Sequence, residues 1–498
     1  MNLVIFSGGT ATNALTPSFY NLTVTKGHEL TYVLPISDNG GSTSEILRVL
    51  GGPAIGDIRS RIVRLIEDEM LVNIFSYRLP DDNRQAKVEW NDIVEGSHPI
   101  WNNISPSVKE MVRAFLIHIQ AELLKKNKGL HNKFNFEKAS IGNLFLTGAR
   151  LFLGSLDASI ELMMRIGRCN SKVNVIPCIN TSHTHHISAL LTNGDVITGQ
   201  SQISHPSKPS INRLASRHST SLQNKNDIFE DLDTELAINS IQTRVPMSHN
   251  HGSYPDHPEI ATPLYEQEMG QIEIEDITKT DYLEEDEEEE EEEEFANPIY
   301  ILPELKNSQL HFDKQDEESM LPAPVKRILY INPYGEEIKP NANIRAISKI
   351  KSADIIVYSI GSVMTSLLPI IILGNLANTI LEKEGTHKVL IINNKYDRET
   401  YGLDAIIYVK MIIDSMIRSI IGFRQKKGLP IINLRSIPWN KFITDIIYLT
   451  KGQIQMDWDS LSKEGIKAHA IDSDKLENEN LEDVLNKIHS SELCQPHY

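Results

Sequence analysis

The stretch SDNGGSTSEILRVLGGPAIGDIRSR, residues 37–61, places two glycine pairs and a third glycine among charged side chains. It follows a nearly all-apolar run at residues 30–36, which predicts a strand, and it continues into apolar residues at helical spacing. Glycines between a strand and a helix let a ligand approach the backbone, because no Cβ atom stands in the way. The helix N-terminus adds N–H groups that favour an anion. The stretch therefore predicts a phosphate-binding loop in an α/β fold.

A second glycine loop, SGGTATN at residues 7–13, follows a strand predicted at residues 2–6. It lacks the G-x-G-x-x-G spacing of dinucleotide-binding folds and the Gly-Lys-Ser/Thr of a P-loop, which argues against hydride transfer with a dinucleotide. Either loop alone is equally well explained as a plain tight turn. Two such loops, followed by the glycine at Gly56-Asp57, favour ligand binding.

Strand and helix signals alternate along both ends of the chain. Further strands are predicted at residues 173–178, 327–331, 354–358, 388–392, 442–449 and 466–471, with a hairpin at 187–203 that turns at Asn193-Gly194. Helices are predicted at residues 42–50, 57–66, 105–123, 140–167, 341–350, 362–383, 403–421 and 481–488. This alternation predicts an α/β fold with a doubly wound, Rossmann-like, mostly parallel sheet.

Residues 205–325 interrupt the alternation. They are rich in Ser, Pro, His, Asn and acidic residues, and residues 284–294 are eleven consecutive acids. This composition predicts a largely disordered acidic insertion. The chain then consists of an N-terminal part of one α/β ligand-binding domain at 1–204, the insertion at 205–325, and the C-terminal part of the same domain at 326–498.

Composition narrows the class of protein. The formal net charge is −18, but it is −7 without the eleven acids, and no long basic face is present, so nucleic acid is not expected as a partner. Three widely spaced cysteines argue against a disulfide framework. The apolar runs are interrupted and no targeting segment is found, which predicts a cytoplasmic protein without a membrane partner. The sequence does not determine whether the protein forms a homodimer.

Two carboxylates stand beside the glycine loops. Asp38 and Asp57 would repel a bound phosphate unless a cation or a ligand hydroxyl offsets their charge. Mg²⁺ suits one or two aspartates, because phosphate oxygens and water complete its coordination. Arg48 or Arg59 could then hold the phosphate through two parallel hydrogen bonds. The alternatives are that Asp57 only caps a helix and that Arg59 is only a surface charge.

These motifs resemble those of the 2-phospho-L-lactate transferase / gluconeogenesis factor (CofD/YvcK-like) family. The matching elements, in the family's order, are Gly8-Gly9-Thr10, Asp38-Asn39-Gly40-Gly41-Ser42 with Leu47-Arg48, Gly56-Asp57-Ile58-Arg59, Ser140-Ile141-Gly142-Asn143-Leu144, Gly361-Ser362 with Thr365-Ser366, and Glu399-Thr400-Tyr401-Gly402. The chain departs from the family pattern at Ser7, Ala11, Ser359-Ile360 and Met364. The acidic insertion gives it the look of a eukaryotic member.

The resemblance implies a Rossmann-like fold and a phosphorylated ligand, and it leaves two behaviours open. Some members resembling this chain transfer a phospholactyl-type group from a nucleotide diphosphate ester to an alcohol, whereas others look like nucleotide-sugar-binding regulators of carbon metabolism. We expect the transferase behaviour, with a nucleotide or nucleotide sugar as the ligand. The implied catalytic residues are Asp38, Asp57 and Arg59, with Mg²⁺ at the two aspartates. The implied ligand-binding residues are Gly8, Gly9, Thr10, Asn39, Gly40, Gly41, Ser42, Arg48, Gly56, Gly142, Asn143, Gly361, Ser362, Thr365, Ser366, Glu399 and Thr400.

Overall fold

The structure is a computed structural model that describes residues 1–8, 11–37, 42–126, 133–204, 321–431, 433 and 437–491. Most of the predicted insertion lies outside these residues. Six predicted site residues also lie outside them, namely Gly9, Thr10, Asp38, Asn39, Gly40 and Gly41.

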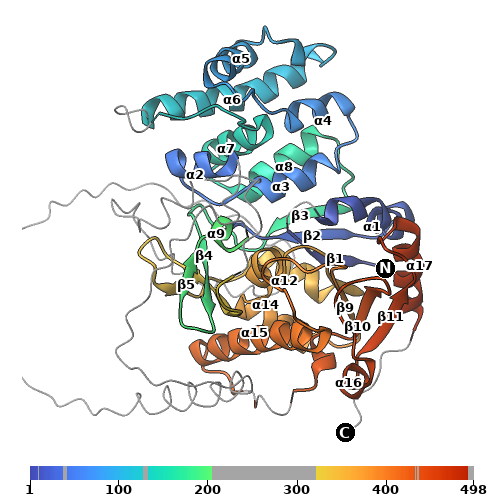
Figure 1. Ribbon diagram of the computed structural model, residues 1–498. Helices are drawn as coiled ribbons and strands as arrows, with labels where there is room; N and C mark the ends of the chain where they lie inside the picture. Colours follow the sequence, from blue (N-terminus) through green and yellow to red (C-terminus); the bar gives the residue numbers. More distant parts are fainter. Residues whose placement is uncertain are drawn as a thin grey trace, which may run out of the picture. The chain divides into compact units, whose positions relative to one another are not determined.

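The centre of the fold is a parallel sheet of seven strands in the order β11-β10-β9-β8-β1-β2-β3 (Figure 1). The strands are β1 (Leu3–Phe6), β2 (Leu30–Leu34), β3 (Val173–Pro177), β8 (Ile355–Tyr358), β9 (His387–Ile391), β10 (Asp445–Leu449) and β11 (Lys467–Ile471). Strands β1, β2, β8 and β9 are buried along their whole length, as expected of a parallel sheet covered on both faces. The predicted α/β class and doubly wound sheet are confirmed.

Segments from both sides of the insertion meet in the middle of this sheet. Strand β1 pairs with β2 on one side and with β8 on the other, and Leu3 is opposite both Leu30 and Ile355 in register. The sheet therefore cannot form from residues 1–204 alone, because its central strand needs a neighbour from beyond residue 325.

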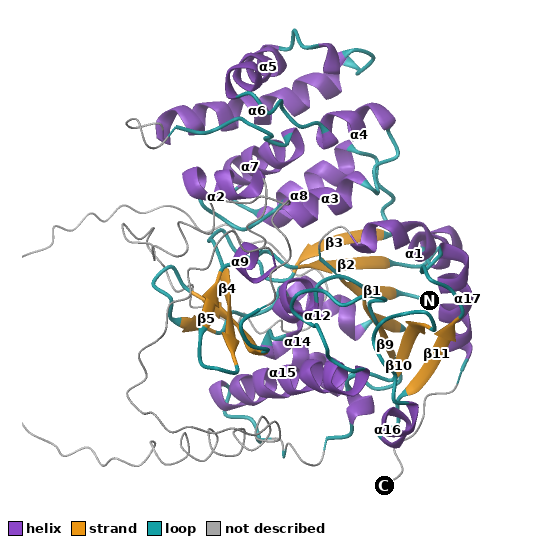
Figure 2. Ribbon diagram, viewed as in Figure 1, coloured by secondary structure: helices purple, strands orange, loops and turns teal. Residues whose placement is uncertain are grey.

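Helices flank the sheet (Figure 2). Helix α1 (Thr16–Leu22) lies beside α17 (Asn478–Ser490), and Asn21 donates a hydrogen bond to Glu482 at 3.1 Å. Helices α12 (Ile344–Lys351), α14 (Gly374–Glu382) and α15 (Ala405–Lys426) form a second group. The shorter helical elements are η1 (Ala11–Leu15), η2 (Val24–Lys26), η3 (Pro99–Trp101), the π-helical turn η5 (Val363–Leu367), α13 (Leu368–Ile371), η7 (Trp439–Lys441) and α16 (Trp458–Lys463).

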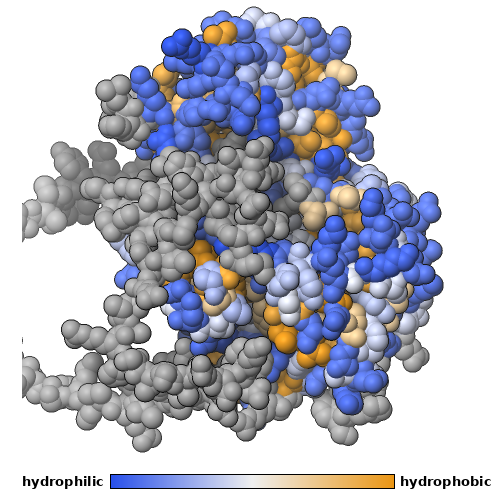
Figure 3. All heavy atoms as spheres, viewed as in Figure 1, coloured by the Kyte–Doolittle hydropathy of each residue, from blue (hydrophilic) through white to orange (hydrophobic). Residues whose placement is uncertain are grey.

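A layer of seven helices is inserted between β2 and β3. They are α2 (Ser42–Leu50), α3 (Gly56–Val63), α4 (Glu69–Ser76), α5 (Asn83–Glu95), α6 (Pro106–Lys126), α7 (Ile141–Leu153) and α8 (Leu156–Ile166). The first ten residues of α7 are all buried, so this helix forms the core of the layer. The outer surface of the layer is mostly hydrophilic, with scattered hydrophobic side chains (Figure 3).

Two predicted helices are broken in the structure. The helix predicted at 140–167 ends at Gly154, whose φ of 71° lies in the left-handed region, and α8 starts after it. The helix predicted at 362–383 is divided into η5, α13 and α14. Proline and glycine near these breaks remove the regular hydrogen-bond pattern of a single helix.

A second, antiparallel sheet has the order β5-β4-β6-β7. Its strands are β4 (His186–Leu191), β5 (Val196–Thr198), β6 (Val325–Ile331) and β7 (Glu337–Ile338). The predicted hairpin is present, but its second strand ends at Thr198 and a short helix, α9 (Gln200–Ser204), follows. The strand predicted at 327–331 joins this sheet and not the parallel one.

Among the described residues, no single helix is long and apolar enough to cross a membrane. One pair, Val363–Ile371 and Gly374–Glu382, passes the same test of length and composition only when its two helices, bent by 74°, are taken together.

Candidate functional site

The order of the strands places the topological switch point of the parallel sheet at the C-terminal ends of β1 and β8, and we call the region between the two loops that follow them the crevice. The chain leaves β1 toward β2 and leaves β8 toward β9, in opposite directions, so these two strands form the switch point where α/β sheets bind ligands. Thr12 ties the two loops together, because its hydroxyl donates to the Ile360 carbonyl at 2.9 Å and lies 3.1 Å from the Ser359 hydroxyl. The first predicted loop and the predicted Gly361-Ser362 element therefore meet.

Glycine is required on both sides of this crevice. A Cβ atom at Gly8 would lie 2.7 Å from Cβ of Ser366 and 3.0 Å from its hydroxyl oxygen. Gly361 has a φ of 138°, and both of its backbone polar groups bond the side chain of Asn393, at 3.1 and 2.7 Å. The two loops therefore pack closely, because Gly8 leaves room for the side chain of Ser366 and a Cβ atom at Gly361 would lie 3.4 Å from the Gly8 carbonyl oxygen.

Hydroxyl groups surround one buried carboxyl group beside the crevice. The hydroxyls of Ser204 and Ser362 both donate to the carboxylate of Glu399, the former at 2.6 Å. Thr365 donates its backbone N–H to the Ser362 hydroxyl at 3.0 Å, and its own hydroxyl lies 2.9 Å from that of Ser204. Burial raises the pKa of Glu399 to about 7, Asp397 adds to the rise, and the two serines oppose it. Glu399 can therefore gain or lose a proton near neutral pH.

The predicted Gly56-Asp57-Ile58-Arg59 element forms the start of α3. Ile55, not Asp57, occupies the N-cap position, and Asp57 is buried inside the first turn, so the helix-cap alternative for Asp57 is wrong. Arg59 donates to Asn143 at 3.2 Å. Burial lowers the pKa of Arg59 to about 10, and Arg78 adds to this while Asp57 opposes it. Arg59 is therefore a largely buried cation beside a carboxylate, not a surface charge.

Gly142 and Asn143 hold this arginine in place. A Cβ atom at Gly142 would lie 2.3 Å from the Phe75 carbonyl oxygen and 2.9 Å from Cγ of Arg59. Asn143 is buried, and its amide also donates to the Thr43 hydroxyl of α2 at 3.3 Å. The predicted Gly-Asn element thus fixes Arg59 against the start of α2.

Three other predicted ligand-binding residues, Arg48, Thr400 and Ser42, lie outside the contacts described above. Arg48 donates to both carboxylate oxygens of Glu45, at 2.7 and 2.6 Å, so its charge is already paired within α2. Thr400 is buried and its hydroxyl donates to Asp397 at 2.5 Å, which stabilises a turn. Ser42 begins α2, directly after the undescribed loop. Arg59 is therefore a better candidate than Arg48 for holding a phosphate.

The sequence did not predict the burial of Arg61 or two buried polar atoms that lack hydrogen-bond partners. Arg61 is 1% exposed, stacks 4.4 Å from the Tyr32 ring centroid and donates to Thr16 at 2.7 Å. Burial lowers its pKa. Within the described part of the chain, the side-chain amide oxygen (Oδ1) of Asn13 and the hydroxyl of Ser37 are buried without a hydrogen-bond partner. Such groups usually bind water or a ligand, and their places at the ends of the two glycine loops were the available signal.

The described residues do not by themselves make a metal site. No group of three or more His, Cys, Asp or Glu side chains among them is placed to hold a metal ion. Asp57 is the one predicted magnesium ligand that the structure describes. A Mg²⁺ ion bound mainly by phosphate oxygens needs only one or two carboxylates, so the buried carboxylate of Asp57 is compatible with such a role.

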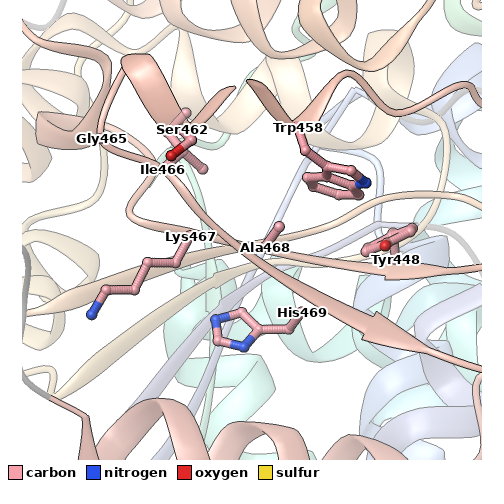
Figure 4. A pocket seen from close by; sticks show the side chains of 8 residues that line it. All are labelled: Tyr448, Trp458, Ser462, Gly465, Ile466, Lys467, Ala468 and His469. Carbon is pink, nitrogen blue, oxygen red and sulfur yellow. The ribbon is translucent and has the colours of Figure 1, made fainter. Parts of the chain in front are cut away.

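A pocket of about 590 Å³ lies elsewhere, at the edge of the sheet (Figure 4). It is lined by β10, α16 and β11, through Tyr448, Trp458, Ser462, Gly465, Ile466, Lys467, Ala468 and His469. Strand β11 is four strands away from β1 in the sheet order. This pocket is therefore separate from the crevice between the glycine loops.

Comparison with known proteins decides the family. The family model described as 2-phospho-L-lactate transferase CofD matches residues 3–488. The chain belongs to the CofD family. The resemblance seen in the ordered motifs is confirmed, and the family match extends across both sides of the insertion.

Individual proteins and solved structures are also similar to this chain. "Uncharacterized protein YNL011C" of Saccharomyces cerevisiae is 63% identical over 98% of this chain and 99% of its own length. A candidate gluconeogenesis factor of Thermotoga maritima is 25% identical over 39% of this chain and 62% of its own length. The crystal structure of a UPF0052-family protein from Bacillus halodurans matches 97% of this chain and 98% of its own, with a TM-score of 0.51 and 15% identity, which supports the fold.

Proposed function

We propose that this CofD-family protein binds a nucleotide-linked, phosphorylated small molecule at the crevice between β1 and β8 and transfers its phosphorus-containing group to an acceptor. The observation that carries this proposal is the close approach of Gly8 to Ser366 at the switch point of the sheet. The backbone N–H groups of glycine loops and the small hydroxyls of serine and threonine both suit phosphate oxygens.

Four charged residues are proposed to take part in this chemistry. Arg59, largely buried and held by Asn143, would stabilise negative charge that develops on the phosphate. Asp38 would orient the acceptor hydroxyl. Asp57 would position the Gly56 loop, and the two aspartates would hold Mg²⁺ together with phosphate oxygens. Glu399, with a pKa raised to about 7, is a further group that could hold a proton near the ligand.

In the proposed transfer, the acceptor hydroxyl oxygen forms a bond to phosphorus and the bond from phosphorus to the nucleotide oxygen breaks. The hydroxyl proton passes to a carboxylate of the site, and a nucleoside monophosphate leaves. The direct test is to incubate the protein with a nucleoside diphosphate ester, Mg²⁺ and a pool of acceptor alcohols, and to measure released nucleoside monophosphate. Release that disappears in Asp38→Asn and falls about 100-fold or more in Arg59→Met supports transfer.

A second candidate is a regulator that binds a nucleotide sugar without turnover. The names of two bacterial relatives, both candidate gluconeogenesis factors, favour it. The same incubation distinguishes the two functions. Tight binding of the nucleotide ester without release of nucleoside monophosphate, whichever acceptor is added, would contradict the transferase function.

The crevice itself has a separate binding test. Gly8→Ala places a methyl group against Ser366, so binding of inorganic pyrophosphate should weaken at least tenfold in calorimetric titration. A thermal melt of the ligand-free variant checks that it is folded. Unchanged pyrophosphate binding by the folded variant would show that the loop is only a turn.

A further inference from the structure

Arg398 lies in the loop that follows β9, directly before the predicted Glu399-Thr400 element. Among the residues that the structure describes, its guanidinium makes no hydrogen bond, and two of its nitrogens, Nε and Nη1, are buried without a partner. Burial lowers the pKa of Arg398, and the neighbouring Glu399 opposes this. A half-buried arginine that leaves its donors unused is costly, because those donors have lost water and gained nothing in return.

The neighbouring carboxylates do not take these donors. Glu399 accepts from Ser204 and Ser362 instead. One oxygen of Asp397 accepts from the backbone N–H groups of Glu399 and Thr400, at 3.1 and 2.8 Å, and from the Thr400 hydroxyl. The carboxylates of Asp397 and Glu399 therefore take their hydrogen bonds from groups other than Arg398.

The loop is also anchored to its surroundings, so Arg398 has a defined position. Asn393 holds it to Gly361 of the crevice through two hydrogen bonds. The backbone N–H of Tyr396 donates to Gln453 at 3.1 Å. The arginine thus stands one strand away from the switch point, on the same edge of the sheet.

Two aromatic residues, Tyr396 and Tyr401, flank Arg398 in the sequence of this loop. Tyr401 is 66% exposed, and its ring centroid lies 5.7 Å from that of Tyr396, at an interplanar angle of 55°. An exposed aromatic side chain on a fixed loop offers a surface on which a planar ring can stack. In the family motif, Tyr401 occupies the variable position between Glu399-Thr400 and Gly402.

We propose that Arg398 and Tyr401 form a subsite for a planar aromatic group that carries an anionic group. This rests on the proposed function, since it assigns the part of the ligand that extends from the crevice toward β9. Arg398 binds the anion through its two unused N–H groups, and Tyr401, supported by Tyr396, stacks on the ring. The ring belongs either to a nucleotide or to an acceptor, and these two sources share the same chemistry.

Calorimetric titration with three probes tests the subsite. GDP carries a nucleobase, FMN carries a larger tricyclic ring with one phosphate, and inorganic pyrophosphate has charge but no ring. Arg398→Met should weaken binding of pyrophosphate and of the ring-bearing probe about 10- to 100-fold, the value of a charge-assisted hydrogen bond. Tyr401→Ala should weaken only GDP or FMN, by about 5- to 100-fold. If Tyr401→Ala weakens binding of GDP, the ring belongs to a nucleotide. If it weakens binding of FMN, the ring belongs to an acceptor.

Lys395→Met is the matched control, because it removes one positive charge from the same loop at an exposed position. It should change every affinity less than twofold. Arg398→Lys keeps the charge but loses the planar pair of donors, so it should bind more weakly than wild type and more tightly than Arg398→Met. Thermal melts confirm that each variant is folded.

Three results would overturn the assignment. If Arg398→Met binds all probes with the same affinity as Lys395→Met, while Gly8→Ala loses pyrophosphate binding, the subsite is wrong and the proposed crevice is supported. If Tyr401→Ala binds GDP and FMN as tightly as wild type, the stacking surface falls. If the wild-type protein binds none of the three probes, the subsite and the proposed function fall together.

Discussion

Glu399 is a buried carboxyl group beside the crevice whose pKa is raised to about 7. Its two oxygens accept hydrogen bonds from hydroxyls that come from α9 and from the loop after β8. Burial is the largest cause of its raised pKa, so its ionised form is unfavourable in the folded protein. This burial therefore reduces stability at higher pH, where the carboxyl group is ionised.

Replacing Glu399 with Gln should change how stability depends on pH. In wild type, the pKa rises from 4.5 in the unfolded chain to about 7 in the folded protein, so the free energy of unfolding falls as pH rises through this window. Glu399→Gln should remove this slope, so between pH 4 and 8 its free energy of unfolding relative to wild type should rise by about 3 kcal/mol. Urea unfolding between pH 4 and 8 measures this. Glu464→Gln, at an exposed position, should follow wild type, and an unchanged slope in Glu399→Gln would contradict the raised pKa.

Close contact between helices decides the architecture at the next scale. Gly148 of α7 faces the backbone of α6, and a Cβ atom there would lie 2.3 Å from the Phe115 carbonyl oxygen. Backbone cannot move aside as a flexible side chain can, so this glycine sets the separation of the two helices. The neighbouring aromatic contact between Phe115 and Phe145, with ring centroids 5.6 Å apart, depends on that separation.

Gly148→Ala should destabilise the protein by about 1–3 kcal/mol, because the added methyl group overpacks the contact between α6 and α7. Gly422→Ala is the matched control in another helix, α15. Its Cβ would meet only the end of the flexible Lys339 side chain, at 3.2 Å, so the change should be neutral or should stabilise by up to about 1 kcal/mol. Equal effects of the two changes in chemical unfolding would show that helix propensity, and not packing, decides the outcome.

Three strands are linked by one buried carboxylate. Asp445 of β10 bonds His387 of β9 at 2.9 Å and His469 of β11 at 2.8 Å, and it accepts from Thr444 at 2.7 Å. Burial tends to raise the pKa of Asp445, but the bonds from His387, His469 and Thr444 outweigh it and hold the pKa well below its usual range. The ionised form therefore stabilises this edge of the sheet.

Asp445→Asn should lower the free energy of unfolding at pH 7 by about 1–3 kcal/mol. The stabilisation by the carboxylate is present above the unfolded pKa of 3.8 and is lost as pH falls below it, so the difference between variant and wild type should narrow under acid conditions. Asp483→Asn, at an exposed position of α17, should have little effect. A difference that does not narrow below pH 4 would contradict the depressed pKa.

For the whole molecule, the decisive feature is that the insertion divides one sheet. Strands β1 and β8 are adjacent although more than 340 residues separate them in the sequence, and four strands of the parallel sheet follow the insertion. Each part of the chain therefore exposes a sheet edge until the other part pairs with it.

Replacing residues 210–290 with a short Gly/Ser linker should leave this sheet intact. We expect a single cooperative unfolding transition, and pyrophosphate affinity within twofold of wild type. The reason is that every described strand and helix lies outside the replaced segment. Differential scanning calorimetry and titration measure both properties. Aggregation or loss of the transition would contradict the predicted boundaries of the insertion.

Local patterns in the sequence were sufficient for the α/β class and for most strands of the parallel sheet. Apolar runs such as residues 30–36 and the glycines at positions 8 and 361 encode strands and close backbone approach within windows of a few residues. The family motifs also singled out Glu399 and Arg59 as candidate site residues. These features depend on neighbouring residues and on steric limits that any fold must respect.

Only the tertiary structure decided which polar groups are buried and which residues they pair with. It buried Arg61, paired Arg48 with Glu45 and moved the strand at Val325–Ile331 into a second sheet. It also left Arg398 without a hydrogen-bond partner among the described residues. Burial and hydrogen-bond partners depend on which segments meet in space, and a sequence window does not contain the segment that lies opposite.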